Sequence, residues 1–272
     1  MLTHIKNLIL DMDGVLWRGE TPMPGLVDFF ATMRHLQMGF ALATNNATKT
    51  AVQYVEKLAR FGVDVPAANI VTSAEATAAY LRQEYEAETA VYVVGESGLH
   101  NAIAAQGFHI ISGAEVRDGA VPTLVVAGFT RYATYDELAM GALAVHKGSR
   151  FVGTNPDPSF PSELGPLPGA GAIIAFIQTA TGVTPTLVGK PGPIMFQQAM
   201  QRLGGTPANT AMVGDRLTTD IAGGQAAGLA TILVLSGISS RDDVANGDIK
   251  PDYIFADITE LTEKLKRGGS HS

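Results

Sequence analysis

Short apolar runs alternate with amphipathic helical patterns along almost the whole chain of 272 residues. Such alternation is typical of β-α-β units, in which strands pair in parallel and helices cover the sheet. The expected strands are Lys6 to Leu10, Phe40 to Ala43, Ile70 to Thr72, Ala90 to Val94, Leu124 to Ala127, Arg150 to Gly153, Thr186 to Val188, Ala211 to Val213 and Thr231 to Leu235. The sequence therefore predicts an α/β fold with a mainly parallel sheet.

Apolar residues at helical spacing lie between these runs and predict the helices. The expected helices are Leu26 to Leu36, Thr48 to Phe61, Ser73 to Gln83, Leu99 to Gln106, Asp136 to His146, Ala170 to Ala180, Ile194 to Leu203 and Ile221 to Ala227. Ser73 is a candidate N-cap, because its hydroxyl can accept a hydrogen bond from the first turn. The closing residues 268–272, Gly-Gly-Ser-His-Ser, are typical of a flexible tail.

Five prolines lie within the segment from Asn155 to Pro168. A proline fixes one backbone angle and removes an amide donor, so regular structure is not expected there. We predict a stiff loop. It either recognises a ligand, as irregular segments on a rigid scaffold often do, or only connects two elements.

The composition excludes several classes of function. There are 26 acidic and 19 basic residues, and the resulting charge of −7 disfavours nucleic-acid and anionic-membrane partners. Cysteine is absent, which excludes disulfides, thiolate metal sites and phosphatases with a cysteine nucleophile. No apolar run reaches the roughly 18 residues of a membrane span, and the first ten residues do not resemble a signal peptide. A cytoplasmic location is therefore expected.

Carboxylates stand at the ends of two expected strands, where open α/β sheets place their ligands. Asp11 and Asp13 follow the first strand, and Asp215 with Asp220 follows the strand at Ala211 to Val213. Carboxylates held close together repel one another unless a cation or a proton intervenes, and hard oxygen ligands suit Mg²⁺. The alternative is that the first pair caps a turn and that the second pair caps the next helix.

Two further polar signals also follow strands. Thr44-Asn45-Asn46 could hold a phosphate through its side chains and the free amides of the next helix, or it could be a capping loop. Lys190 could neutralise phosphoryl charge, although most lysines are only solvated. The segment is not a nucleotide-binding P-loop, because Pro191 follows the lysine and no glycine stands five residues before Gly189.

Together the four signals resemble the ordered motifs of the haloacid dehalogenase-like phosphatases. They read D-M-D-G-V-L-W from Asp11, T-N-N from Thr44, V-G-K-P around Lys190 and G-D-R-L-T-T-D around Asp215. With T-N-P-D at Thr154, they are most similar to the branch that includes NagD-type nucleotide phosphatases, para-nitrophenyl phosphatases, phosphoglycolate phosphatase and pyridoxal phosphate phosphatase. The resemblance covers nearly the whole chain. Its motifs indicate that a phosphate group is bound, but they do not indicate which leaving group the substrate carries.

The resemblance implies a role for each of these residues. Asp11 would be the nucleophile that forms an aspartyl-phosphate, and Asp13 would be the acid and base. Mg²⁺ would bind the Asp11 side chain, the Asp13 carbonyl oxygen and Asp215, with Asp220 supporting these ligands. The phosphoryl group would bind Thr44, Asn45, Asn46 and Lys190.

The resemblance also implies a doubly wound, Rossmann-like core of residues 1–80 and 183–272, with an α/β cap of residues 81–182 inserted into it. A cap favours small phosphate esters over phosphoproteins and often forms a homodimer interface in relatives. In pyridoxal phosphate phosphatases the loop of the cap carries a histidine, whereas Phe160 stands at the matching position here. That departure argues against pyridoxal phosphate, and Phe160 would either favour aryl phosphates or shape the entrance.

The expected function is that of a Mg²⁺-dependent phosphomonoesterase acting on small phosphorylated metabolites, with no nucleic-acid or membrane partner. A phosphotransferase or mutase would use the same aspartyl-phosphate but transfer the phosphoryl group to a second hydroxyl. A non-catalytic phosphate-binding protein is the third alternative. Release of free phosphate into water distinguishes the first from the other two.

Overall fold

The computed structural model describes residues 2–47, 49–162 and 165–269, and the chain divides into two compact units. The core unit comprises Met1–Thr44, Ala51–Val71 and Lys190–Ser272. The second unit comprises Asn45–Thr50 and Thr72–Gly189. The domain boundaries expected after residues 80 and 182 stay a prediction.

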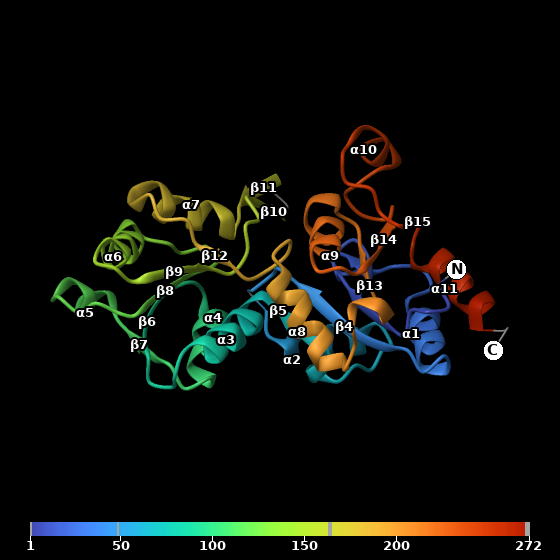
Figure 1. Ribbon diagram of the computed structural model, residues 1–272, viewed down its shortest axis with the longest axis horizontal. Helices are drawn as coiled ribbons and strands as arrows, with labels where there is room; N and C mark the ends of the chain where they lie inside the picture. The colour runs from blue at the N-terminus through green and yellow to red at the C-terminus, as the bar shows by residue number, and fades with distance from the viewer. Residues whose placement is uncertain (1, 48, 163–164, 270–272) are drawn as a thin grey trace. The chain divides into compact units, whose positions relative to one another are not determined.

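A six-stranded sheet forms the centre of the core unit (Figure 1). Its order is β15-β14-β13-β1-β4-β5, and β1 pairs in parallel with both β4 and β13. These strands are β1 (Asn7–Leu10), β4 (Gly39–Thr44), β5 (Ile70–Thr72), β13 (Thr210–Gly214), β14 (Ala230–Val234) and β15 (Tyr253–Phe255). The strands that come next in the core sheet, β4 and β5, lie on one side of β1, and the later strands β13, β14 and β15 lie on its other side. The strand order therefore reverses between β1 and β13. That reversal is where α/β sheets of this kind bind ligands.

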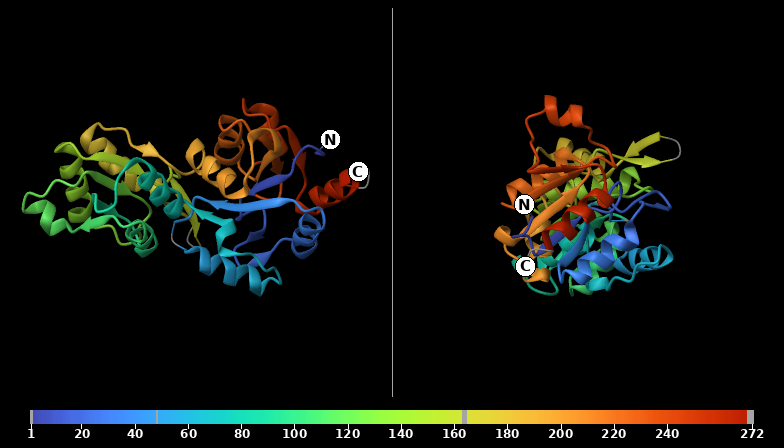
Figure 2. Two further views of the ribbon diagram at one scale, coloured as in Figure 1. Left: turned by 60° about the horizontal axis from the view of Figure 1, so that its bottom comes forward. Right: turned by 90° about the vertical axis from the view of Figure 1, so that its right-hand side faces the viewer.

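Helices cover both faces of the core sheet (Figures 1 and 2). The α-helices are α1 (Leu26–His35), α2 (Ala51–Arg60), α8 (Pro193–Leu203), α9 (Ala222–Ala226), α10 (Arg241–Asn246) and α11 (Ile258–Gly269). Leu8 and Leu10 of β1 are buried with Phe29 and Phe30 of α1, whereas α8 contacts β1 and β4. Because both faces are covered, β1 is buried at all four residues, and Leu8 to Leu10 read as a continuous apolar run.

Short elements complete the core unit. The hairpin β2 (Trp17–Arg18) and β3 (Thr21–Pro22) follows β1 directly. The 3₁₀ turns η1 (Ala67–Asn69) and η2 (Pro207–Asn209) precede β5 and β13. After β13 the chain makes a π-helical turn, η3 (Leu217–Ile221), before α9. The helix expected at Ile221 to Ala227 is therefore a π-helical turn followed by a short α-helix.

The second unit has its own five-stranded sheet, of order β12-β9-β8-β6-β7, with every neighbouring pair parallel. The strands are β6 (Ala90–Val94), β7 (His109–Ile111), β8 (Leu124–Ala127), β9 (Arg150–Gly153) and β12 (Thr186–Leu187). The helices are α3 (Ser73–Glu84), α4 (Ser97–Ala105), α5 (Gly113–Arg117), α6 (Tyr135–His146) and α7 (Ala170–Thr181). The predicted parallel-sheet α/β class is confirmed.

The proline-rich segment is not the irregular loop that its composition predicts. Ser159–Ser162 (β10) and Gly165–Pro168 (β11) pair antiparallel, and Figure 2 shows them as a two-stranded ribbon that projects from the second unit. In an isolated pair both strands are edge strands, and proline is tolerated where its missing amide needs no partner. The prolines therefore limit the ribbon to two strands rather than preventing it.

Three local predictions are also wrong. The strand at Thr186 falls within the core expected from residue 183 onward, but it pairs with β9 of the five-stranded sheet. Thr72, not Ser73, caps α3, because its hydroxyl accepts a hydrogen bond from the Glu75 amide. Residues 268 and 269 end α11 rather than forming a tail, and 270–272 lie outside the described residues, as does Thr48. Among the described residues, no helix is long and apolar enough to cross a membrane.

Candidate active site

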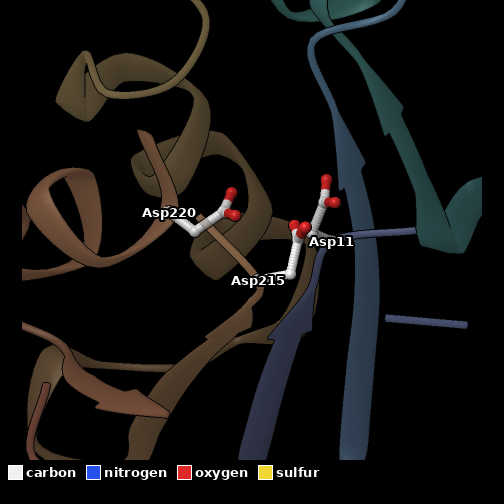
Figure 3. Close-up of side chains that lie close together, drawn as sticks. All are labelled: Asp11, Asp215 and Asp220. Carbon is white, nitrogen blue, oxygen red and sulfur yellow. The ribbon is translucent and has the colours of Figure 1, made fainter. Parts of the chain in front are cut away.

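Three carboxylates meet at the carboxyl end of the core sheet. Asp11 follows β1 and Asp215 follows β13, and these strands are neighbours in parallel register. Asp220 reaches the same point from the π-helical turn η3. Figure 3 shows Asp11 and Asp215 side by side, with Asp220 facing them. The site therefore lies where the strand order reverses, as the fold predicts.

Lys190 provides a buried cation within this cluster. Its Nζ donates to Asp11 Oδ1 at 2.5 Å, to Asp220 Oδ1 at 2.7 Å and to the carbonyl oxygen of Ala43 at 3.0 Å. Only 2% of the residue is exposed. A buried ammonium group needs paired partners of this kind, since its desolvation costs several kcal/mol. Lys190 is thus a fixed charge of the site and not a solvated lysine.

Burial and charge shift the protonation of this cluster. Burial raises the pKa of Asp11 well above its ordinary value, against the opposing effect of Lys190. Burial and the neighbouring Asp220 raise the pKa of Asp215 to about 6. Burial alone would lower the pKa of Lys190, but the negative charges of Asp11 and Asp220 outweigh it and raise that pKa. Without a further cation, the ionised forms of Asp11 and Asp215 are therefore disfavoured.

Glycines allow the backbone to close around Asp215. A Cβ atom on Gly237 would lie 1.9 Å from Asp215 Oδ2, and one on Gly14, where φ is +85°, would lie 2.5 Å from it. The same oxygen accepts a hydrogen bond of 2.8 Å from the Ile238 amide. Asp215 is therefore held in one orientation by its neighbours.

The position of Asp220 is fixed in a similar way. Its Oδ2 accepts a hydrogen bond of 3.1 Å from the Arg216 amide, while its Oδ1 accepts from Lys190. A Cβ on Gly214 would lie 2.2 Å from the Asp220 Cβ, so only glycine fits at that strand end. Both carboxylate oxygens thus contact the protein.

The donor set fits a hard divalent cation. Asp11, Asp215 and Asp220 each offer an oxygen, and these oxygens lie within 4.8 Å of one another. Oxygen ligands with carboxylate charge suit Mg²⁺ better than softer metals. Three carboxylates around Lys190 also leave an excess of negative charge in this cluster, which a cation would offset. The acidic side chains of this cluster are those of Asp11, Asp215 and Asp220. Among the described residues, the Asp13 carboxylate is not part of it.

Asp13 is exposed on the loop after β1, and its carboxylate is bound elsewhere. Trp17 Nε1 donates to Asp13 Oδ1 at 2.8 Å. The Trp17 ring stacks on that of Tyr54, whose hydroxyl pKa is raised by burial and then by the charge of Asp13. The sequence motif contained both Asp13 and Trp17, but only the fold brings Tyr54 of α2 beside them.

The residues of the T-N-N motif divide between the two units. Thr44 ends β4 and is buried in the core unit. Asn45 belongs to the second unit, where its Nδ2 donates to Asp157 Oδ2 at 3.1 Å and its carbonyl oxygen accepts from Asn155 Nδ2 at 2.8 Å. Asn46 is exposed. The structure thus links the T-N-N motif to T-N-P-D, a connection that the sequence did not predict.

Comparison with known proteins decides the family. A model described as "Haloacid dehalogenase-like hydrolase" matches residues 8–109, and a second model for HAD-like hydrolases matches residues 187–261. An acid sugar phosphatase of Staphylococcus aureus (strain USA300) is 37% identical over 266 residues, covering 98% of this chain and all of the relative. This chain belongs to the haloacid dehalogenase-like hydrolases. The resemblance carried by the four motifs is confirmed.

Solved structures of the family have the same fold. A 4-nitrophenylphosphatase from Thermotoga maritima is 35% identical and superimposes with a TM-score of 0.90. The match covers 97% of this chain and 98% of the nitrophenylphosphatase chain. A glycerol phosphate phosphatase from Mycobacterium tuberculosis, in complex with magnesium, is 33% identical and superimposes with a TM-score of 0.88. The match covers 97% of this chain and 79% of the glycerol phosphate phosphatase chain. The chain is a phosphoric monoester hydrolase of the haloacid dehalogenase-like family.

Proposed function

We propose that this haloacid dehalogenase-like phosphatase hydrolyses small phosphorylated metabolites with Mg²⁺ and an aspartyl-phosphate intermediate. The observation that carries the proposal is the Asp11 carboxylate, which lies at the reversal of strand order, 2.5 Å from the ammonium group of Lys190 and beside Asp215. A carboxylate in that position is paired with a cation and stands where a ligand would bind.

The reaction divides into two displacements. In the first, an Asp11 oxygen bonds to phosphorus as the ester P–O bond breaks, and the Asp13 carboxyl gives its proton to the leaving oxygen. In the second, water bonds to phosphorus while Asp13 takes up its proton, and the Asp11 carboxylate is released. Lys190 neutralises the charge spread over the phosphoryl oxygens.

Asp11, the carbonyl oxygen of Asp13 and Asp215 would hold the Mg²⁺, and Asp220 would keep Lys190 and the Arg216 amide in place. A bound Mg²⁺ supplies positive charge that lets the anionic nucleophile meet an anionic phosphate. Thr44, Asn45 and Asn46 would orient the phosphate. The magnesium complex of the glycerol phosphate phosphatase and the oxygen-only donor set support this choice of ion.

The names of the relatives support a small ester as substrate, since they are acid sugar, 4-nitrophenyl and glycerol phosphate phosphatases. Phe160, on β10 of the second unit, packs edge-on against Phe129 with ring centroids 4.7 Å apart. The Arg131 guanidinium lies 5.0 Å from the Phe129 centroid and 5.5 Å from that of Phe160. We propose that this ribbon helps to select the leaving group, and that a structural crossover is the alternative role.

The test is phosphate release from para-nitrophenyl phosphate and a panel of sugar, glycerol and nucleoside phosphates, with Mg²⁺ or with excess chelator. We expect release that needs Mg²⁺ and is abolished by Asp11→Asn. Asp28→Asn is the matched control, because Asp28 is a surface carboxylate that pairs with Lys266, and it should retain activity. Acid-quenched protein incubated with labelled ester should carry label in the unsubstituted chain and in Asp28→Asn, but not in Asp11→Asn.

Other outcomes would favour the alternatives. Labelled protein whose phosphoryl group moves only to an added sugar acceptor would identify a phosphotransferase or mutase. Phosphate-ester binding with no labelling would identify a binding protein. The expected homodimer stays a prediction, and light scattering measures it.

A further inference from the structure

The residue that contacts the Asp13 carboxylate cannot itself exchange a proton. Trp17 Nε1 donates to Asp13 Oδ1 at 2.8 Å, and an indole N–H is a donor only. Asp13 is exposed, whereas Trp17 is fully buried. An exposed carboxylate is therefore hydrogen-bonded to a buried residue of the core unit.

The loop geometry brings the two side chains together. The carbonyl oxygen of Met12 accepts from the Leu16 amide at 2.8 Å, and the Gly14 amide donates to the carbonyl oxygen of Trp17 at 2.7 Å. Asp13 and Trp17 also form an isolated β-bridge. The chain thus closes a tight turn between these two residues, and the indole N–H points at the carboxylate across it.

Side chains of α2 and the residue after it hold the indole in place. The ring of Tyr54 stacks on it with centroids 6.3 Å apart and an interplanar angle of 19°, and the Phe61 centroid lies at 6.1 Å. Lys57 Nζ lies 4.6 Å from the Trp17 centroid, which is within the range of a cation–π interaction. Trp17 is thus packed on several sides.

Lys57 is an unusual member of this group, because a lysine with 4% exposure needs a structural reason. Its Nζ donates to the Gly19 carbonyl oxygen at 2.6 Å and lies 3.4 Å from Glu20 Oε1. Gly19 and Glu20 form the turn of the β2–β3 hairpin that begins at Trp17. Lys57 therefore fixes both the indole ring and the hairpin that carries it.

From this arrangement we infer that Trp17 is a positioning residue, which holds the Asp13 carboxyl where it can transfer a proton to the leaving oxygen. The inference rests on the proposed acid role of Asp13. The proton still moves from the Asp13 carboxyl to the ester oxygen as the P–O bond breaks, and the indole N–H keeps its own proton throughout. Misplacement of a catalytic group by a small distance lowers the rate without weakening substrate binding.

The test compares two leaving groups. A nitrophenolate leaves readily without protonation, whereas the alkoxide of glycerol phosphate or a sugar phosphate needs the acid. The ratio kcat/KM covers the steps up to release of the leaving group, so it isolates the acid role from hydrolysis of the intermediate. For Trp17→Phe we expect kcat/KM to fall about 10- to 100-fold for the alkyl ester and by less than about threefold for para-nitrophenyl phosphate.

Phe40→Leu is the matched control, because Phe40 is a buried aromatic residue of the same apolar core that packs edge-on against Phe30 rather than on the indole. It should alter thermal stability without changing the ratio of the two kcat/KM values. In Asp13→Asn, adding Trp17→Phe should change that ratio no further, because the group to be positioned is already lost. Binding of inorganic phosphate should be the same in Trp17→Phe and the unsubstituted chain.

A second substitution removes the hydrogen bond without a cavity. Trp17 is the sole tryptophan of the chain, so growth of a tryptophan auxotroph on benzothienylalanine replaces only this N–H with a sulfur of similar shape. This protein should show the same selective loss as Trp17→Phe. Equal losses for both esters in Trp17→Phe, or a selective loss in Phe40→Leu, would overturn the inference. Failure of the proposed function is distinguishable, since the unsubstituted chain would then release no phosphate from either ester.

Discussion

Replacing Lys190 by methionine should destabilise the core unit in a way that depends on pH. Lys190 donates to Asp11 and Asp220, and both contacts are buried. Methionine has a similar volume but no charge, so the substitution leaves the carboxylates without their ammonium partner. The pKa of Asp11, which burial already raises, also loses the cation that lowers it and should rise further.

The magnitude follows from the burial of these partners. Removing one member of a buried ion pair costs about 3–5 kcal/mol, because the remaining charge is uncompensated. For a unit of this size, about 1 kcal/mol corresponds to about 2–4 °C in Tm, so the expected loss is about 6–20 °C at pH 8. A carboxyl whose pKa is raised on folding stabilises the fold at low pH, and that contribution is lost as pH rises through the raised pKa. The deficit of Lys190→Met should therefore shrink as pH falls from 8 to 5.

The assay is thermal unfolding of the metal-free protein between pH 5 and pH 8, with Lys57→Met as the matched control. Lys57 is also buried, but it contacts a backbone carbonyl and Glu20, whose side chain is 67% exposed. Its loss should cost about 1–3 kcal/mol and should not vary over this pH range. Added Mg²⁺ should restore part of the Lys190→Met deficit. A deficit that is the same at every pH would refute this account of the cluster.

Two further predictions concern Asp215. Because its pKa is raised to about 6, chelated protein should lose up to about 3 kcal/mol of unfolding free energy as pH rises from 4 to 7, and urea titrations of Asp215→Asn should lack that slope. If the unfolding free energy of Asp215→Asn depended on pH in the same way, the dependence would come from other groups and the prediction would be wrong. Gly237→Ala would place a methyl group 1.9 Å from Asp215 Oδ2, so calorimetry should show Mg²⁺ affinity about 10- to 100-fold weaker. Gly268→Ala, where the nearest atom would lie at 3.7 Å, should leave that affinity unchanged, and equal effects of the two would contradict the steric argument.

Five of the six strands of the core sheet could be predicted from the sequence because they are buried on both faces, whereas β15, whose first two residues are half-buried, was not expected. Each reads as an apolar run, and the first polar residue after it marks the edge of the sheet. Asp11 and Asp215 were expected to meet for that reason, and the structure places them side by side. Their roles in binding an ion and a phosphoryl group stay predictions.

Other features depend on contacts between residues that are distant in the sequence. The pattern around Thr186 predicts a strand but cannot say which sheet it joins, because a short strand of this kind can pair at the edge of either sheet. The proline-rich ribbon was not predicted because proline is disfavoured in the interior strands of a sheet, where its missing amide removes a hydrogen bond. The isolated pair of β10 and β11 has no interior strand. A lysine in an amphipathic helix is normally read as solvent-facing, so the buried Lys57 could be found only from the fold.

The central place of β1 in the core sheet has a consequence for synthesis on the ribosome. One neighbour of β1, β4, emerges soon after it, but the other, β13, begins at Thr210, after the whole second unit has been made. The edge of β1 that pairs with β13 must therefore wait until most of the chain has been made. Long-range parallel pairing of this kind is slow and exposes apolar strands meanwhile. Chain-termination products that stop before Thr210 should thus be targets for chaperones and proteases, and they would lack Asp215 as well.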